Sequence, residues 1–391
     1  MTIKSYPKIY FILLFIGFTI MIGNGLSSAF LSIMAKELDP LGVLAGFVIS
    51  AWFISRIFTE LPSGIISNRI GRQRLIMIGL AMGSCGSFIC ALSNSIYALI
   101  LGRAIWGLGA SLYFMSNTAL ILNLFEPRIR GRALGLFQGI EHIGSFIAAP
   151  IGAFMAVGLG SFNAVFYFAT SLISVSFLLA FFSKDLRVIG KSGNSGPSLN
   201  LKKVLKEIWN WDIIVLSINS LTRNLTLAGI TGTVFPIYLN QVSKLNIELI
   251  GIIMTTRFLG FILALFTSDY LSGKIGRQKT MIAAMFIEGA ALYIYTAISR
   301  FEFFLLTAPF EGFGEGIVFT TLIIQLSETV PSQIRGGALG LYRTFQDIGG
   351  FTGPILLMFA FDNFGVTSPF FLSLAILGLN ILLLATINRR K

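Results

Sequence analysis

Charge is scarce in this chain of 391 residues, because Asp, Glu, Lys and Arg together make up only 12% of it. Soluble proteins carry about 25% charged residues, and a soluble fold with so few could not cover its own surface. The composition therefore excludes a disordered chain and an ordinary cytosolic enzyme. Hydrophobic residues make up 55% of the chain, and the mean hydropathy is +0.82. These values indicate a protein embedded in lipid.

Residues that carry enzyme chemistry are also few. His142 is the only histidine, and the only two cysteines, Cys85 and Cys90, point to different faces of one apolar segment. The sequence has no metal-ligand spacing, no Ser/His/Asp context and no Gly-x-x-x-x-Gly-Lys-Ser/Thr phosphate loop. We therefore predict no enzyme, no metal site and no cofactor, and transport driven by ATP is disfavoured.

Long uncharged runs fill much of the chain, for example residues 9–35, 143–183 and 363–388. A membrane-spanning helix needs about 20 mostly apolar residues. Polar breaks at 93–95 and 158–163 divide the longer runs into pairs of spans. We therefore predict an all-α integral membrane protein with twelve transmembrane helices, at 8–35, 41–66, 75–92, 96–124, 133–157, 164–183, 211–239, 247–270, 279–298, 303–328, 337–361 and 368–387.

Most Lys and Arg residues between these spans fall on one side of the predicted membrane. The other side has only Lys36, Lys244 and Arg300. Because basic loops stay in the cytoplasm, we expect a multi-pass protein of the plasma membrane with both termini cytoplasmic. The net charge of +12 then reflects orientation against the lipid bilayer, and we expect no nucleic-acid partner.

Short motifs recur at a constant offset of 205 residues. Ile-Gly-Arg-Gln at 70–73 returns at 275–278, and Arg-Gly-x-Ala-Leu-Gly-Leu at 130–136 returns at 335–341. Six spans per half is an even number, so the halves share one orientation and form parallel repeats. We predict an N-terminal six-helix bundle over 1–190, a cytoplasmic linker over 191–208 and a C-terminal six-helix bundle over 209–391.

Twelve spans in two repeats with a central cytoplasmic loop resemble the major facilitator superfamily. That family's signature Gly-x-x-x-Asp-Arg-x-Gly-Arg-Arg is similar to Gly64, Asn68, Arg69, Gly71 and Arg72, with Asn68 in place of the usual Asp. The resemblance covers the whole chain. It implies a monomeric secondary transporter that moves a small-molecule substrate by alternating access.

Two further motifs resemble the proton-coupled branch of that family. Arg103 is followed by Gly107 and Gly109 in the fourth span, and Gly144-x5-Pro150-x-Gly152 in the fifth span is similar to an antiporter signature. A more degenerate second copy of the cytoplasmic signature runs from Asp269 through Gly276 and Arg277. These motifs imply a proton gradient as the energy source.

Ionisable groups inside spans are the candidate site, because a buried charge in lipid is costly and normally faces a cavity or a partner. Glu311 and Glu315 form an i,i+4 acidic pair, Arg343 and Asp347 a second i,i+4 pair, and His142 maps onto Asp347 by the 205-residue shift. Asn24 and Asn117 add polar contacts. The predicted cavity and coupling residues are Arg103, Glu141, His142, Arg223, Arg257, Glu288, Glu311, Glu315, Arg343, Asp347, Asn24 and Asn117.

Glycines and prolines indicate where the helices pack and move. The two copies of the cytoplasmic signature predict gating loops that are made in one state and broken in the other. The loop residues are Gly64, Asn68, Arg69, Gly71, Arg72, Asp269, Gly276 and Arg277. Small residues permit close helix packing, and proline softens a helix. We assign these roles to Gly144, Pro150, Gly349, Gly353 and Pro354.

The substrate class stays open between two alternatives. The motifs and the aromatic, acid-containing interior favour efflux of drug-like, amphipathic molecules. The intramembrane arginines favour uptake or exchange of an anionic or polar metabolite. A membrane receptor or channel is the alternative from another class, and the twofold repeat of ionisable groups argues against it.

Overall fold

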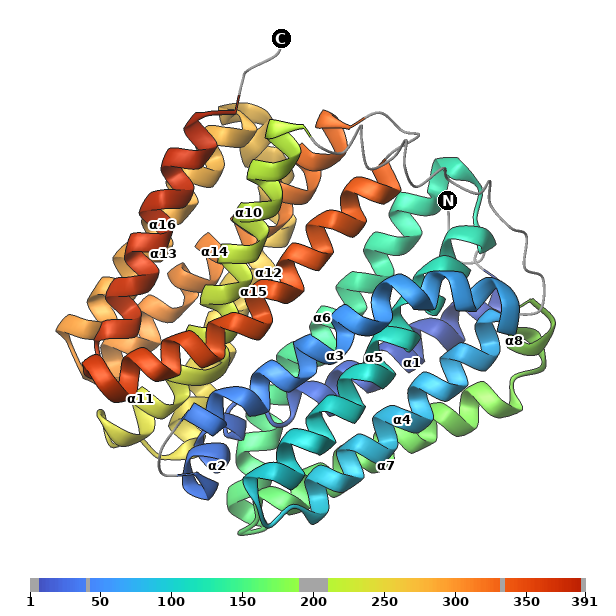
Figure 1. Ribbon diagram of the computed structural model, residues 1–391, viewed down its shortest axis with the longest axis horizontal. Coiled ribbons are helices and arrows are strands. Elements are labelled where there is room, and N and C mark those ends of the chain that lie inside the picture. The colour runs from blue at the N-terminus through green and yellow to red at the C-terminus, as the bar shows by residue number, and fades with distance from the viewer. Residues whose placement is uncertain (1–6, 40–42, 190–209, 331–334, 388–391) are drawn as a thin grey trace. The chain divides into compact units, whose positions relative to one another are not determined.

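The protein is described by a computed structural model over residues 7–39, 43–189, 210–330 and 335–387 (Figure 1). Within these ranges every regular element is a helix and no strand occurs, which confirms the predicted all-α fold. The elements are α1 (Lys8–Gly25), α2 (Leu31–Leu38), α3 (Val43–Ile70), α4 (Arg72–Leu92), α5 (Ile96–Leu124), α6 (Pro127–Gly158), α7 (Phe162–Phe182), α8 (Lys184–Ile189), α10 (Trp211–Thr226), η2 (Leu227–Val234), α11 (Phe235–Gln241), α12 (Ile247–Ile275), α13 (Arg277–Ala297), α14 (Phe301–Thr329), α15 (Arg335–Phe364) and α16 (Ser368–Ala385).

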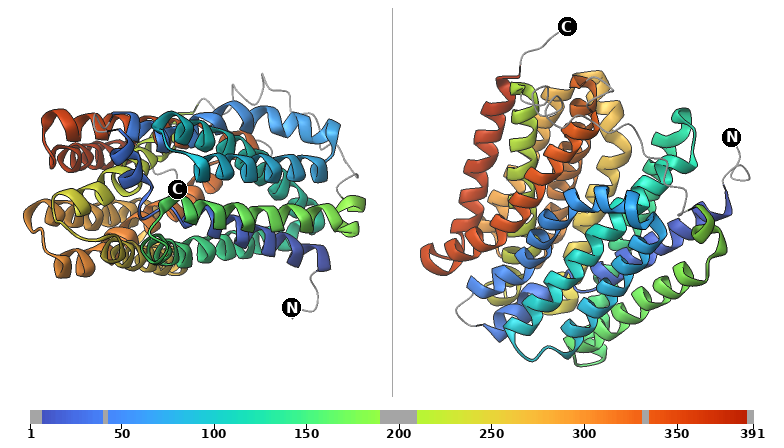
Figure 2. Two further views of the ribbon diagram at one scale, coloured as in Figure 1. Left: turned by 90° about the horizontal axis from the view of Figure 1, so that it is seen from below. Right: turned by 45° about the vertical axis from the view of Figure 1, so that its right-hand side comes forward.

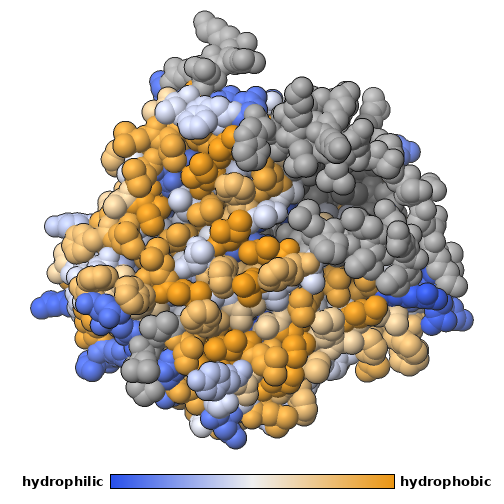
Figure 3. Space-filling view, in the orientation of Figure 1, coloured by the Kyte–Doolittle hydropathy of each residue, from blue (hydrophilic) through white to orange (hydrophobic). Residues whose placement is uncertain are grey.

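The surface of the helices is apolar. In the described parts of the chain, nine helical segments are long and apolar enough to cross a membrane, and α3, α14 and α15 are further long helices at predicted span positions. Apolar residues cover most of the coloured part of the face shown in Figure 3. Phe266 and Phe364 are 80% and 75% exposed. Such exposure suits a lipid environment, so this is a multi-pass membrane protein.

The helices form two compact units, Met1–Phe30 with Ala51–Pro197 and Leu31–Ser50 with Ser198–Lys391. In the first unit α4 packs on α5, and α1 packs on α6. In the second unit the equivalent helices pair in the same way, α13 on α14 and α10 on α15 (Figure 2). The same pairing in both units is what an internal duplication produces. The predicted linker at 191–208 lies outside the described residues.

Residues Leu31–Ser50 cluster with the second unit although they precede the repeat boundary in sequence. Lys36 Nζ binds Asp362 Oδ1 at 2.6 Å, and Ser50 Oγ donates to the carbonyl of Phe351 at 2.6 Å. A Cβ on Gly46 would lie 2.6 Å from the carbonyl oxygen of Pro354. This segment is therefore bound to α15 by an ion pair, a hydrogen bond and close packing.

Polar residues cap the N-termini of the helices that follow the breaks between predicted spans. The Ser95 hydroxyl caps α5 by accepting from the amide of Ala98 at 3.3 Å, and Ser161 caps α7 through the amide of Ala164 at 3.4 Å. Asn246 caps α12 in the same way through Leu249 at 3.1 Å. These side chains bond amides that have no partner within the helix, which is why the breaks recognised in the sequence become loops.

The first helix of each repeat departs from regular α-helix geometry at an equivalent position. The prediction of one continuous span over 8–35 was wrong in detail, because α1 stops at Gly25, a turn follows at 26–30 and α2 begins at Leu31. The 205-residue shift carries that turn onto 231–235, where the π-helix η2 ends and α11 begins. Hydropathy does not reveal these interruptions, since no charged residue lies in either stretch.

Candidate functional site

The second unit contains a buried network of ion pairs. Arg223 of α10 binds Glu315 of α14, and Arg257 of α12 binds both Glu315 and Glu311. Arg257 Nη2 donates to Glu311 Oε1 at 3.1 Å. All four side chains are buried. Because Glu315 accepts from both arginines, the network joins three helices at one point.

Glycine packing places the charged side chains. A Cβ on Gly312 would overlap the backbone carbonyl of Arg257, so α14 approaches α12 more closely than any side chain allows. Glu311 and Glu315 are one turn apart and share the face that this contact turns toward Arg257. The close approach at Gly312 therefore positions both acids against Arg257.

Arg223 retains bonding capacity. Its guanidinium carbon lies 4.6 Å from the centre of the Phe319 ring, while Nε and Nη1 are buried without a hydrogen-bond partner among the described residues. The neighbouring Asn224 donates from Nδ2 to the carbonyl of Gln346 at 2.7 Å and ties α10 to α15. The Arg223 guanidinium is thus held in place, and two of its nitrogens, Nε and Nη1, remain able to donate hydrogen bonds.

Arg103 of the first unit has an aromatic environment. Its guanidinium carbon lies 4.7 Å from the ring centre of Trp52 and 5.3 Å from that of Trp106. The residue is 6% exposed, and in the described part of the chain it makes no ion pair. Nε and Nη1 are buried without a hydrogen-bond partner there. The rings of Trp52 and Trp106 are therefore the partners of Arg103, through cation–π contact.

The other predicted cavity residues of the first unit are spread over α1, α5 and α6. Asn117 is buried and donates from Nδ2 to the hydroxyl of Tyr113 at 2.7 Å, whereas Asn24 is half-buried. Glu141 is buried on α6. The side chain of His142 lies outside what the structure describes.

Predicted residues of α15 line its contact with α10. A Cβ on Gly349 would overlap the carbonyl of Leu221, and one on Gly353 would overlap that of Leu225. Pro354 lies inside α15, as Pro150 lies inside α6. In the first unit Gly144 is equivalent to Gly349, and its Cβ would lie 2.8 Å from the carbonyl of Phe18.

Asp347 is buried on α15, whereas Arg343 is half-buried. Of the predicted residues, the ion-pair network gathers Arg223, Arg257, Glu311 and Glu315. The roles of Arg343 and Asp347 stay predictions.

Both predicted gating loops reduce to a single glycine between two helices. Gly71 joins α3 to α4 with φ 94° and ψ 140°, and Gly276 joins α12 to α13 with φ 97° and ψ 140°. Only glycine adopts this conformation readily, which explains the glycine at both positions. Arg72 is buried at the start of α4. Gly64, Asn68 and Arg69 lie on α3, and their side chains fall outside the description.

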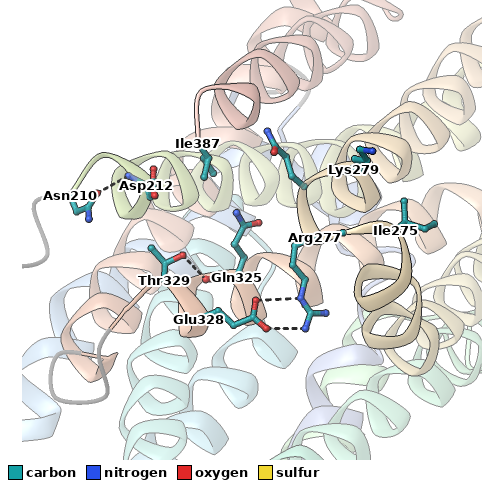
Figure 4. A pocket seen from close by; sticks show the side chains of 11 residues that line it. Asn210, Asp212, Ile275, Arg277, Lys279, Gln325, Glu328, Thr329 and Ile387 are labelled. Atoms are coloured by element: carbon teal, nitrogen blue, oxygen red, sulfur yellow. Dashed lines mark hydrogen bonds and ion pairs between the residues drawn. The ribbon is translucent and has the colours of Figure 1, made fainter. Parts of the chain in front are cut away.

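Arg277 is the centre of a polar pocket of about 600 Å³ in the second unit (Figure 4). It binds Glu328 Oε1 at 2.9 Å and Asp269 Oδ1 at 3.1 Å. Asp269 and Arg277 were predicted from the signature. Glu328 was not predicted, and the rule that orients the spans gives no signal for it, because acidic residues contribute little to that rule.

The fold and these buried charges define a class, the two-repeat membrane transporter. Comparisons with known proteins then give the family. The family model of the Major Facilitator Superfamily matches residues 13–222 and 213–391. The chain therefore belongs to the major facilitator superfamily. It is a secondary transporter that works by alternating access, and it is not an enzyme.

Known proteins resemble the chain over 90% or more of their own length. The chain is 25% identical over 389 residues to the quinolone resistance protein NorA of Staphylococcus aureus (strain MSSA476), covering 98% of each chain. It is 23% identical over 373 residues to multidrug resistance protein 2 of Bacillus subtilis (strain 168), covering 92% of this chain and 90% of that protein. A crystal structure of a mutant of the nucleoside transporter NupG has a TM-score of 0.78 at 15% identity, covering 96% of this chain and 100% of that one. This last likeness concerns the fold alone.

Proposed function

We propose that this transporter exports drug-like, amphipathic organic molecules in exchange for protons. The observation that carries the proposal is the buried ion-pair network of α10, α12 and α14, since charges of that cost inside a membrane mark ion or substrate pathways. Two relatives, a quinolone resistance protein and a multidrug resistance protein, support the substrate class by their names.

The distribution of charge between the repeats supports the proposal further. Arg257 and Glu311 are equivalent by the 205-residue shift to Trp52 and Trp106, whose rings lie 5.9 Å apart. The ion pair of one repeat therefore replaces an aromatic pair of the other. Aromatic surface suits an amphipathic molecule, and buried carboxylates suit proton exchange and a cationic group.

We give the remaining predicted site residues supporting roles in the proposal. Asn24, Asn117, Glu141, His142, Arg343 and Asp347 supply polar contacts around the substrate path. The loops at Gly71 and Gly276, with the Asp269–Arg277–Glu328 pairs, act as gates. Pro150 and Pro354 permit the bending of α6 and α15. We place the protein in the plasma membrane as a monomer, with both termini cytoplasmic because of the basic loops.

Exchange of an anionic metabolite is the second candidate. Arg103 and Arg223 both carry buried guanidinium nitrogens without a hydrogen-bond partner among the described residues. An anionic group on a substrate would satisfy these donors. The observation favours a substrate that carries a carboxylate, which a quinolone also does.

Flux in proteoliposomes tests the proposal. With an acidic lumen, protons leaving the vesicle should drive accumulation of tetraphenylphosphonium and of a quinolone, and a protonophore should abolish it. Accumulation independent of the pH gradient would contradict proton exchange. Accumulation of small carboxylates, with neither drug-like probe transported, would replace efflux by the second candidate.

A further inference from the structure

Glu288 is a fifth charged group beside the ion-pair network. It lies on α13 and is 4% exposed. Unlike Glu311 and Glu315, it makes no ion pair or hydrogen bond in the part of the chain that the structure describes. A buried carboxyl without a partner is rare, because desolvation of the charged form is not repaid.

Helix packing places Glu288 next to the network. A Cβ on Gly314 would lie 3.1 Å from both the amide nitrogen and the Cβ of Glu288. Gly314 stands between Glu311 and Glu315 on α14, so α13 meets α14 between the two paired acids. The position equivalent to Glu288 in the first repeat is Gly83, which has no side chain. The carboxyl is therefore a specific addition of the second repeat.

The charges that act on Glu288 can be named element by element. From α14 they are Glu311 and Glu315, from α12 Arg257, and from α10 Arg223. The third helix packed on α13 is α16, which carries no ionisable residue. Two arginines balance two glutamates in this set. Glu288 alone decides whether the cluster is neutral or carries one negative charge.

We infer that Glu288 carries the proton that is exchanged for a cationic substrate. The inference rests on the proposed function and names the group that performs the coupling. When the cluster is open to water, the O–H bond of the Glu288 carboxyl breaks and its proton passes to a water molecule. The positive group of the substrate then restores neutrality, and proton uptake on the other side of the membrane releases it. Glu311 and Glu315 keep their arginines throughout.

Binding measurements on the purified full-length protein test this assignment with tetraphenylphosphonium as the probe. Binding to the wild type should release about one proton, so its affinity should rise about tenfold per pH unit. Glu288→Gln should bind the probe without proton release and with no pH dependence. Glu302→Gln is the matched control, because Glu302 is an exposed glutamate in the first turn of α14, and it should behave as the wild type.

The effect of the Glu288 substitution on folding must be distinguished from its effect on proton coupling. Glu288→Gln removes no bond that the structure shows, so its unfolding temperature should equal or exceed that of the wild type. Glu288→Asp retains a carboxyl and should restore proton release. Proton release by Glu288→Gln equal to the wild type would overturn the inference and leave proton-coupled efflux intact. A wild type that neither binds nor transports the probe would instead overturn the proposed function, and the inference with it.

Discussion

Arg257 stands in the second repeat where Trp52 stands in the first. The backbone carbonyl of each faces a glycine of a neighbouring helix, Gly312 in one case and Gly107 in the other. The side chains differ, since Trp52 meets Trp106 and Arg103, whereas Arg257 meets Glu311 and Glu315. Duplication therefore preserved the backbone packing, while the exchanged side chains gave the repeats an aromatic interior and a charged one.

Loss of Glu315 should destabilise the second unit. Glu315→Gln leaves the buried Arg223 without its carboxylate, and breaking one partner of a buried pair costs about 3–5 kcal/mol. Glu328→Gln also removes a partner of an arginine, but that carboxylate is 54% exposed and should cost less than about 1 kcal/mol. Thermal unfolding of both variants in one detergent measures the difference. Equal unfolding temperatures would show that the buried pair contributes no more than the exposed one.

Arg103 should be required for transport and not for folding. Arg103→Ala removes cation–π contacts worth about 2 kcal/mol when desolvated, and it strands no acid. We expect flux of tetraphenylphosphonium to fall by about tenfold or more while the protein still purifies as a folded species. Arg187→Ala, at an exposed position on α8, is the control and should transport normally. Normal flux through Arg103→Ala would remove Arg103 from the mechanism.

The spans and the duplication were predictable because both can be recognised in short stretches of sequence, as apolar runs and as motifs that recur at a constant offset. Hydropathy and polar breaks placed the fourth span at 96–124, where the structure has α5 at Ile96–Leu124. The turn at 26–30 escaped, since Leu26 and Phe30 are as apolar as the helix around them. A helix interruption of this kind depends on tertiary packing, such as the contact of the Leu26 carbonyl with Gly152.

The members of the ion network were predictable, but their pairing was not. Each charged residue within a span was recognisable alone, because lipid makes an isolated charge costly. The bond between Arg223 and Glu315 joins residues 92 positions apart, and nothing local in the sequence links them. In the sequence Glu311 and Glu315 looked like a pair of acids sharing a site, whereas in the structure both form ion pairs with arginines.

Substitution of Gly276 by alanine should destabilise the protein. Its φ of 97° is a conformation that a Cβ strains by about 1–3 kcal/mol. Gly276→Ala should therefore lower the unfolding temperature and disturb the Arg277 pairs that follow it. Gly273→Ala is a close control on the same helix, since a Cβ there meets nothing within 4 Å and alanine favours the helix by up to about 1 kcal/mol. A stability loss as large in Gly273→Ala would mean that the backbone conformation at Gly276 is not the cause.

The contact between Lys36 and Asp362 should open during transport. Lys36 belongs to the first repeat by sequence, yet it binds α15 of the second unit at 2.6 Å. Alternating access moves the repeats against each other, so a contact that bridges the two sequences must break in one state. In a variant with Cys85 and Cys90 replaced by serine, Lys36→Cys and Asp362→Cys joined by a short thiol cross-linker should lose transport. Cleavage of the linker should restore it.

A matched cross-link distinguishes this contact from general rigidity. Ser84 and Ser174 share a hydrogen bond of 2.7 Å between α4 and α7, both within the first unit. Cysteines at that pair, joined by the same reagent, should leave transport unchanged, because these helices belong to one compact unit and also to one sequence repeat. Undiminished flux in the cross-linked Lys36/Asp362 variant would show that residues 31–50 travel with the second repeat through the whole cycle. The moving boundary would then lie within α3, after Ser50, instead of between the two sequence repeats.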